Sequence, residues 1–247
     1  MDCTFSRERL ARLAEIEQWH FWFVGRRALI DRLLARYLPP AGQSLLDVGC
    51  GTGRMLEILA GRGYRVAGVD QRPEGLAVVR QALPEAQLEQ ASAAALPLPP
   101  AAFDGVLLLD VLEHVVPGPV LAEIHRVLKP GGYAIITVPA MPWLWSYRDE
   151  AAGHRCRYTR RGLQETLKRG LFEVETIQYY QCLLFPVVVL ARLLGRTGPV
   201  TRDQEERPLP MLNAIMTRIN LLEVRLGKRV RWPWGSSLAA VCRKSSA

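Results

Sequence analysis

The chain is poor in cysteine, and the cysteines that it has stand alone. Cys3, Cys50, Cys156, Cys182 and Cys242 include no Cys-x-x-Cys pair. Structural zinc sites and iron-sulfur clusters use closely spaced cysteines as ligands, so we expect neither, and we predict no metal site. Isolated cysteines also fit a reducing compartment, where disulfides are rare.

The sequence also lacks a long apolar run and the pattern of a secretory leader. The apolar stretch at 183–190 is soon followed by Arg192 and is too short to span a bilayer. The first residues, Met-Asp-Cys and a charged amphipathic segment, have no basic end, apolar centre or small-residue cleavage site. We therefore expect a cytoplasmic protein, with peripheral attachment to the inner face of the membrane as the second placement.

An apolar strand runs into a glycine turn at 45–53, Leu-Leu-Asp-Val-Gly-Cys-Gly-Thr-Gly. Glycines at alternate positions let the backbone turn sharply and let a ligand approach where a Cβ would collide. A helical stripe follows, and then a second strand that ends in Asp70, nineteen residues beyond Gly51. This spacing puts a carboxylate within reach of ribose hydroxyls, so the unit predicts a nucleoside ligand.

One glycine of the usual dinucleotide fingerprint is missing. Counted from Gly49, the pattern Gly-x-Gly-x-x-Gly requires glycine at position 54, which is Arg54. Asp47, inside the end of the first strand, would repel a pyrophosphate because both are negative. A ligand with an amino group or a positive charge fits Asp47 better, and a nicotinamide-dependent oxidoreductase stays as an alternative.

Four motifs across residues 43–140 resemble, in order, those of the class I S-adenosylmethionine-dependent methyltransferases. They are the glycine motif, the approach to a strand at 96–104, the stretch Asp-Val-Leu-Glu-His-Val at 110–115 and the Leu-Lys-Pro-Gly-Gly turn at 128–132. The resemblance implies an α/β fold, a Rossmann-like doubly wound sheet of seven strands that is mostly parallel with the last strand antiparallel. It implies S-adenosyl-L-methionine as cofactor and S-adenosyl-L-homocysteine as product.

The length of 247 residues, with 49% hydrophobic and 23% charged residues, suits one catalytic domain with attachments. We expect an N-terminal helical cap over 1–40, with one helix that begins at Ser6, a second over 26–38 and the aromatic residues 19–23 between them. We expect a cofactor-binding core over 41–179 and 236–247. Strands expected at 172–179 and 237–242 are joined in the family by a short hairpin. Here a basic, helical insertion over 180–235 separates them.

The resemblance places the cofactor outside the carboxyl ends of the strands, where ligands of open α/β sheets bind. Family members often carry an acidic residue before an alanine near the adenine, and Ser92 is a weaker acceptor at that point. Radical chemistry with this cofactor is not expected, because clustered cysteines are missing. The cofactor-binding residues implied are Asp47, Gly49, Cys50, Gly51, Gly53, Asp70, Gln71, Ser92, Ala93, Asp110 and Val111.

Methyl transfer from a sulfonium is an in-line displacement, in which the protein mainly holds donor and acceptor at attack distance. If the acceptor is a hydroxyl or a protonated amine, His114 or His154 can take its proton near neutral pH. If it is a carboxylate or an acidic carbon, neither is needed. The alternative for His114 and its neighbour Glu113 is a structural role, as a satisfied histidine and a helix-start residue.

Two aromatic segments are candidate acceptor-binding regions. One is Trp-His-Phe-Trp-Phe at 19–23, and the other is the loop at 139–158, rich in Pro, Trp and Tyr, after which Thr159 is expected to cap a helix. The alternative for both is packing, in which the rings hold helices on the sheet. His154, Arg157 and Tyr158 resemble a pattern of family members that act on lipid-like or sugar-linked acceptors. The predicted acceptor-binding residues are Trp19, Trp22, Trp143, Tyr147, Arg157 and Tyr158.

The last part of the chain, from Arg192 onward, carries nearly all of the net charge of +8. From Arg192 onward, eleven Lys or Arg against four Asp or Glu leave +7. An amphipathic helix over 209–226 precedes basic residues and tryptophans at 228–234. This combination suits an anionic membrane surface, with a substrate cap or a dimer helix as alternatives. We do not expect nucleic acid as a partner, because aliphatic residues separate the basic ones. The oligomeric state is not fixed by the sequence.

The sequence thus predicts transfer of a methyl group to a small-molecule or lipid-linked acceptor of apolar character. A membrane-associated protein that keeps the fold and binds without turnover is the second hypothesis, motivated by Ser92 and the insertion. The oxidoreductase is the third.

Overall fold

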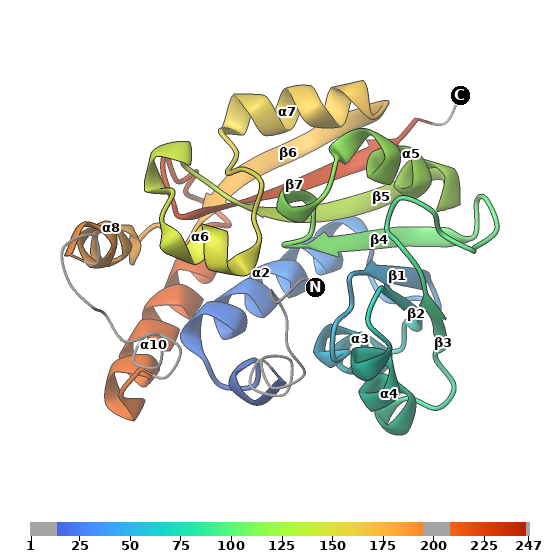
Figure 1. The fold of residues 1–247 in the computed structure, drawn as a ribbon, viewed down its shortest axis with the longest axis horizontal. Coiled ribbons are helices and arrows are strands. Elements are labelled where there is room, and N and C mark those ends of the chain that lie inside the picture. The colour runs from blue at the N-terminus through green and yellow to red at the C-terminus, as the bar shows by residue number, and fades with distance from the viewer. Residues whose placement is uncertain (1–13, 195–207, 246–247) are drawn as a thin grey trace.

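The structure is a computed structural model that describes residues 14–194 and 208–245. Helices and strands alternate through most of this part of the chain (Figure 1). In chain order they are α2 (Phe21–Tyr37), β1 (Ser44–Val48), α3 (Arg54–Ala60), β2 (Arg65–Asp70), α4 (Pro73–Ala82), β3 (Gln87–Gln90), β4 (Phe103–Leu109), η2 (Leu112–His114), α5 (Pro117–Val127), β5 (Leu128–Pro139), η3 (Pro142–Leu144), α6 (Tyr147–Ala152), α7 (Arg160–Arg169), β6 (Phe172–Tyr180), α8 (Phe185–Leu194), α10 (Pro210–Leu226) and β7 (Ser237–Lys244).

Seven strands form a single sheet in the order β3-β2-β1-β4-β5-β7-β6. Every neighbouring pair from β3 to β5 is parallel, whereas β7 is antiparallel to both β5 and β6. The chain builds outward from β1 to β3 and then returns to the other side of β1 with β4. The expected doubly wound sheet with an antiparallel last strand is confirmed, and its switch point lies between β1 and β4.

The central strands are apolar because helices cover both faces of the sheet. One core cluster joins β4 and β5 to residues of α5 and α7, among them Ile124 and Leu163. A second cluster joins the opposite face to α2 and α3 through residues such as Leu33 and Leu59. In Figure 1, α5 and α7 lie above the sheet and α2 lies below it.

Helix α2 begins earlier than the sequence pattern predicts. The aromatic segment was expected between two helices, but Phe21 is already the first helical residue. The reason is a side-chain cap, since His20 Nδ1 accepts a hydrogen bond from the main-chain N–H of Trp22 at 3.2 Å. Burial lowers the pKa of His20 to about 4, so its ring stays neutral and can accept. The helix expected from Ser6 lies almost entirely outside the described residues.

Helix α10 packs against α2 with its polar side. Asn213 accepts from the N–H of Phe21 and donates to the carbonyl of Trp19, and Asn220 donates to the carbonyl of Phe21, at 2.9–3.0 Å. An added Cβ at Gly25 would come within 2.9 Å of Asn220, so the glycine lets the two helices approach closely. The amphipathic helix is confirmed, but the buried residues on it are Asn213, Asn220 and Glu223.

The segment after β5 is more regular than the loop that the sequence predicts. It contains η3 and α6, and Ser146 and Asp149 form a reciprocal capping box at the start of α6. The predicted cap at Thr159 is confirmed, because its hydroxyl accepts from the N–H of Gly162 at 2.9 Å and α7 begins at the next residue.

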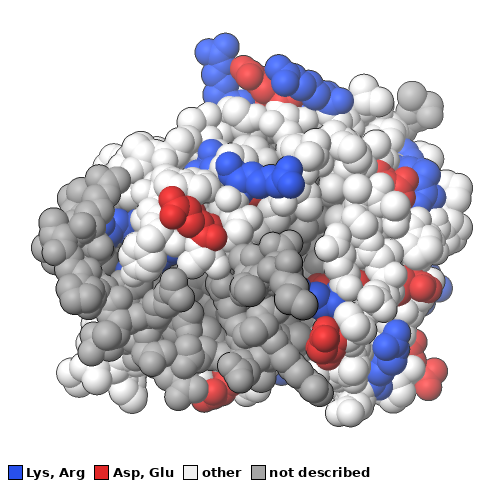
Figure 2. All heavy atoms as spheres, in the orientation of Figure 1, with Lys and Arg blue, Asp and Glu red and all other residues white. Residues whose placement is uncertain are grey.

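Two surface findings bear on partners. None of the helices in the described ranges is long and apolar enough to cross a bilayer. On the face drawn in Figure 2, Lys and Arg side chains of the described residues lie among Asp and Glu rather than in a continuous basic stripe. A basic stripe is the usual electrostatic footprint of a nucleic-acid site.

Candidate active site

Strands β1, β2, β4, β5 and β6 all end at one edge of the sheet, which we call the carboxyl edge. Just beyond three of these strands, non-glycine residues adopt left-handed conformations: Asp110 (φ 56°), Met141 (φ 61°) and Gln181 (φ 58°). Such conformations cost free energy and gather at ligand sites. The backbone therefore turns away sharply at this edge, which is where the sequence places the cofactor.

The glycine turn after β1 has the conformation that its sequence predicts. Gly49, Gly51 and Gly53 have φ values of 81°, 56° and 81°. An added Cβ at Gly49 would lie 2.5 Å from a methyl group of Val111, so the turn packs directly on the residue that follows Asp110. No atom of the described residues lies within 4 Å of a Cβ built at Gly51, so on this part of the chain its main chain faces space that a ligand can fill.

Asp70 closes the turn from the end of β2. Its carboxylate accepts a hydrogen bond from the N–H of Gly51 and another from the N–H of Arg72, both at 2.9 Å. A carboxylate has about four acceptor positions, so these two bonds leave capacity for ribose hydroxyls. The side chain predicted to hold the sugar thus also fixes the position of the glycine turn.

Asp47 lies at the same edge, one strand residue before the turn, and is 3% exposed. No hydrogen bond to its carboxylate is found within the described ranges. Burial, together with the negative charges of Asp70 and Glu17, raises its pKa to about 7 despite the opposing charge of Arg26. A buried carboxylate of this kind gains most from a cationic ligand group, because the cation restores the lost solvation.

The other predicted cofactor residues contribute in different ways. The side chain of Cys50 is buried with Leu56, Leu76 and Val79, so only its main chain faces the turn. Gln71 is exposed beyond β2, and its carbonyl accepts from Gln90. Ser92 is half-buried and accepts from the N–H of Ala94 at 3.3 Å, and Ala93 belongs to the core.

Arg26 of α2 reaches the carboxyl edge and pairs with Asp110 at 2.5 Å. Its guanidinium also lies 4.8 Å from the ring centre of Trp22 and 5.2 Å from that of Phe23. Glu17, just before α2, contacts the hydroxyl of Thr52 in the glycine turn at 3.3 Å. The N-terminal segment therefore covers the carboxyl edge between β1 and β4.

Asp149 anchors the segment after β5. It is 1% exposed and accepts from His154 Nδ1 at 2.9 Å, from Arg157 at 2.7 Å and from Arg192 of α8 at 2.7 Å. Burial alone would raise its pKa, but the hydrogen bond of His154 and the two guanidinium charges hold it below its ordinary value. Asp149 is thus ionised at neutral pH and ties the insertion to the acceptor side.

The two candidate catalytic histidines lie together, with ring centres 4.9 Å apart. His114 Nδ1 lies 3.2 Å from the carbonyl of Gly153, and burial followed by the nearby His154 lowers the pKa of His114. Glu113 Oε1 lies 4.0 Å from His154 Nε2. Burial and then the charge of Asp110 raise the pKa of Glu113 well above its ordinary value.

The predicted acceptor-binding residues fall into two groups. Arg157 and Tyr158 are buried, and their polar atoms bond to protein groups: Arg157 to Asp149 and Ala140, and Tyr158 to the carbonyl of Leu112 at 3.4 Å. Trp19 and Trp22 are half-buried at the start of α2, and Trp143 and Tyr147 are exposed. The indole of Trp143 meets the ring of Phe185 on α8 edge-on at 5.9 Å.

Three residues of the site carried no predicted role: Arg26, Asp149 and Arg192. Asp149 had a usable signal, because Ser146-x-x-Asp149 is a capping-box pattern. Arg26 and Arg192 reach partners 84 and 43 residues away, which no local pattern indicates.

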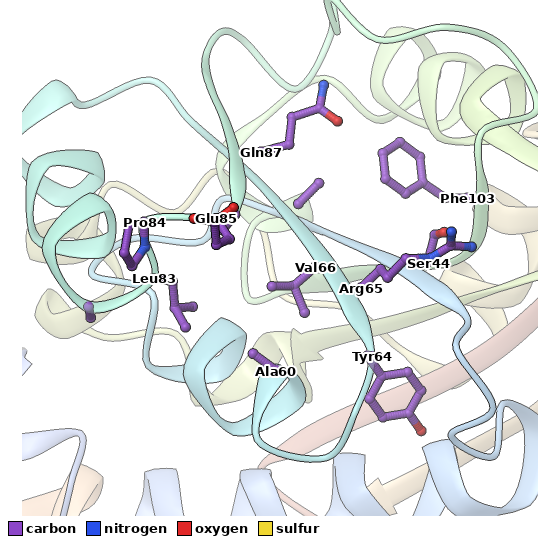
Figure 3. Close-up of a pocket in the computed structure, with 13 residues that line it drawn as sticks. Ser44, Ala60, Tyr64, Arg65, Val66, Leu83, Pro84, Glu85, Gln87 and Phe103 are labelled. Atoms are coloured by element: carbon purple, nitrogen blue, oxygen red, sulfur yellow. The ribbon is translucent and has the colours of Figure 1, made fainter.

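A cavity of about 550 Å³ lies at the opposite end of the sheet. Figure 3 shows that it is lined by Ser44, Arg65, Gln87 and Phe103, which are the first residues of β1, β2, β3 and β4. In parallel α/β sheets, ligands bind beyond the carboxyl ends instead, so this cavity is not the candidate site.

Residues 46–136 match the family model described as a methyltransferase domain. The chain is 37% identical over 129 residues to an uncharacterised methyltransferase of Mycobacterium tuberculosis (52% of this chain, 50% of the relative). It is 31% identical over 159 residues to a probable S-adenosylmethionine-dependent methyltransferase of Mycolicibacterium smegmatis (63% and 61%). It is 39% identical over 109 residues to a ubiquinone biosynthesis O-methyltransferase of Thiobacillus denitrificans (40% and 45%). The chain thus spans about half the length of the curated relatives it matches.

A phosphoethanolamine N-methyltransferase of Haemonchus contortus, solved in complex with S-adenosyl-L-methionine, has the same fold. Its TM-score is 0.65 at 18% identity, over 99% of this chain and 58% of that one. The site fits the family cofactor, since Gly51 faces open space and the buried Asp47 carboxylate suits an amino group. The glycine turn, the sheet order and the family match agree on a class I S-adenosylmethionine-dependent methyltransferase domain over residues 46–136.

Proposed function

We propose that the chain is an enzyme that transfers the methyl group of S-adenosylmethionine to a small, apolar or lipid-linked acceptor. The observation that carries this proposal is the division of the carboxyl edge into two sides. Asp47, the glycine turn and Asp70 form a side suited to a nucleoside with an amino-acid tail. His114 and His154, which lie together beyond Asp110, form the side facing an acceptor.

When bound, the cofactor supplies a methyl group on a positively charged sulfur. Asp47 would hold the amino group of its amino-acid tail, and Asp70 the hydroxyls of its sugar, as the family resemblance implies. Arg26 and the rings of Trp22 and Phe23 cover the edge and exclude water from it. The chain thereby restricts donor and acceptor to the alignment that an in-line displacement needs.

The histidines are placed to take a proton from the acceptor. The carboxylate of Asp149 and the carbonyl of Gly153 can only accept hydrogen bonds, so Nδ1 carries the proton in both His154 and His114. In the neutral ring Nε2 is then the basic atom. An aspartate that fixes the tautomer of a histidine is a common arrangement for a general base.

A hydroxyl acceptor agrees with these bases and with the relative named as an O-methyltransferase of ubiquinone biosynthesis. That relative is matched over less than half its length, so the acceptor is argued from the site. We infer a hydroxyl on an apolar or lipid-linked molecule.

The test is Asp70→Ala, with cofactor binding measured by titration calorimetry. Loss of two hydrogen bonds to a charged group predicts a fall in affinity of about a hundredfold or more. Asp31→Ala is the control. Asp31 of α2 pairs with Arg62, which lies between α3 and β2, away from the carboxyl edge. Unchanged affinity in Asp70→Ala would refute the cofactor site. Methyl transfer to a phenolic lipid analogue separates the enzyme from a protein that binds without turnover.

The exposed side of α10 supports an anionic membrane as a partner. Because its polar side is buried on α2, its large apolar residues face outward, with exposed basic residues beside them and after the helix. Apolar and basic residues together are what an interfacial helix requires. The exposed apolar residues are Leu209, Met211, Leu212, Ile215, Leu222 and Leu226.

This surface is tested by sedimentation with vesicles of phosphatidylglycerol and phosphatidylcholine. We expect binding to the anionic mixture, little binding to phosphatidylcholine alone, and loss of binding in Ile215→Glu and Leu222→Glu. Val78→Glu is the matched control, since Val78 is a similarly exposed helical residue on α4. Equal binding by all three variants, or no binding by the unchanged protein, would refute the membrane contact.

A further inference from the structure

Three side chains with metal-binding atoms meet beside Asp110. Glu113, His114 and His154 each place one donor atom so that all three lie within 4.8 Å of one another. Glu113 and His114 belong to η2, whereas His154 follows α6. The N–H of Arg155 donates to the carbonyl of Glu113 at 2.7 Å and keeps the two segments together. The grouping is therefore built by the fold and not by neighbours in sequence alone.

Both imidazoles are oriented as metal ligands usually are. Histidine ligands commonly donate their second ring N–H to a carboxylate or a backbone carbonyl, which fixes the tautomer and the ring plane. His154 donates from Nδ1 to Asp149 at 2.9 Å, and the contact of His114 Nδ1 with the carbonyl of Gly153 is 3.2 Å. Asp149 is itself held by two arginines. The outer contacts of a metal site are thus in place.

Glu113 supplies an independent sign of a missing ligand. It is 1% exposed, and its Oε2 is buried without a hydrogen-bond partner. A buried carboxylate oxygen without a partner is costly, and native structures seldom keep one without a reason such as an ion. Its other oxygen faces His154 Nε2 at 4.0 Å, too far for a hydrogen bond.

We propose that Glu113, His114 and His154 bind one divalent transition-metal cation of the zinc class. Two imidazoles and one carboxylate form a known donor set for catalytic zinc, whereas magnesium and calcium prefer oxygen ligands. Zinc bonds of about 2.0–2.2 Å in a tetrahedral site put donor atoms roughly 3.4 Å apart. The present distances require the side chains to close by about an ångström. The lack of paired cysteines therefore does not exclude a metal site, because the histidines supply it.

The role of this cation rests on the proposed methyl transfer. Three protein ligands leave coordination positions open, and the site adjoins Asp110 on the acceptor side. A cation there would bind the acceptor oxygen and favour loss of its proton to solvent. That oxygen would then form the new bond to the methyl carbon, while the carbon–sulfur bond breaks and sulfur keeps the electron pair. In the metal-bound state the Nε2 atoms would serve as ligands and not as bases.

The test is calorimetric titration of the metal-free protein with Zn²⁺, together with the visible absorption of bound Co²⁺. We expect one site per chain, lost in His114→Ala and His154→Ala. Asp149→Asn, which keeps all three proposed ligands but removes the carboxylate that orients His154, should weaken binding about 10–100-fold. Glu113→Gln should also weaken it and is accepted as a test only if its circular dichroism matches the unchanged protein.

His125→Ala is the control, because His125 lies on α5 against the ring of Phe172 and should leave Zn²⁺ affinity unchanged. Absence of stoichiometric binding, or equal affinity in the His114 and His154 variants, would overturn the metal site. S-adenosylmethionine affinity is measured on the same variants. If it persists while zinc binding is absent, the metal proposal fails alone; if it is absent from the unchanged protein, the proposed function fails.

Discussion

The two sides of the carboxyl edge are built by different means. The cofactor side consists of a short continuous stretch, the glycine turn after β1, closed by one carboxylate from β2. The acceptor side is assembled from side chains of α2, η2, α6 and α8 that meet only in the folded protein. Backbone geometry thus determines one side, and a network of buried charges determines the other.

Two carboxylates on the acceptor side show how much the network matters. Asp149 and Glu113 are each 1% exposed, and burial raises the pKa of a carboxyl group. Only at Asp149 do the partners, His154, Arg157 and Arg192, outweigh this effect and lower the pKa. Among the described residues no arginine pairs with Glu113 and only His154 comes near its carboxylate, at 4.0 Å, so its pKa is raised. Equal burial therefore fixes neither the charge nor the role of a carboxylate. The partners decide both.

The largest effect is expected from breaking the acceptor side with Asp149→Asn. This change leaves the buried guanidinium groups of Arg157 and Arg192 without their counter-charge, so the free energy of unfolding should fall by about 3–5 kcal/mol. The folded pKa of Asp149 lies below its ordinary value. The stability that its ionised carboxylate provides is therefore complete at pH values above the ordinary pKa. This stability is lost as the pH falls toward the folded pKa. Urea unfolding at pH 7.5 and below pH 4 measures both.

Glu113→Gln in metal-free buffer is the control for that prediction. It removes an equally buried carboxylate with which no arginine of the described residues pairs, so it should not reduce stability at pH 7.5. Equal losses in the two variants would mean that burial, and not pairing, explains the contrast. Cofactor affinity should stay near that of the unchanged protein in both.

A smaller effect is expected from breaking the cofactor side with Gly49→Ala. The left-handed conformation should lower the free energy of unfolding by about 1–2 kcal/mol, and the 2.5 Å contact with Val111 by a further 1–3 kcal/mol. Urea unfolding measures this loss. Gly42→Ala is the matched control. Gly42 also has a positive φ, 72°, but no atom of the described residues lies within 4 Å of an added Cβ. Equal losses in the two variants would show that packing on Val111 is unimportant.

The last effect has the opposite sign and belongs to Asp47→Asn. The folded pKa of about 7 lies above the ordinary value of 3.8, so the unchanged protein loses stability as the pH rises between these values. Without cofactor, the variant should be more stable above pH 7, by up to about 4 kcal/mol, and the two should converge near pH 4. Its cofactor affinity should fall.

Asp104→Asn is the control for this sign. Asp104 lies near the opposite end of β4, and its bonds to Lys129 and Ser44 outweigh burial and hold its pKa below the ordinary value. That substitution should therefore lower stability at neutral pH. A thermal melt across pH 4–8 compares the variants, and parallel curves for Asp47→Asn and the unchanged protein would contradict the assignment.

The cofactor side could be predicted because its residues are close in sequence. The turn, Asp70 and the helices and strands around them follow from glycine spacing and hydrophobic period, and the resemblance supplied the strand order. The acceptor side could be predicted only as a set of residue types. Arg26 meets Asp110 across 84 residues, and Arg192 meets Asp149 across 43, contacts that depend on how whole helices dock.

Helix α10 shows a different limit of prediction from sequence. Its helical period was readable, but period alone does not say which side is buried. Asn213, Asn220 and Glu223 form the buried side because α2 and the start of the insertion present unpaired main-chain groups to them. The apolar side, which a sequence pattern assigns to the core, stays on the surface.

The position of β7 has a consequence for how the protein is made. This strand is the last of the seven in the chain, yet it lies between β5 and β6, and β6 pairs with β7 alone. A nascent chain therefore exposes the apolar flank of β5 until residues 237–244 leave the ribosome. Throughout that interval β6 has no strand to join, so chaperone binding during synthesis should concentrate on this unfinished side.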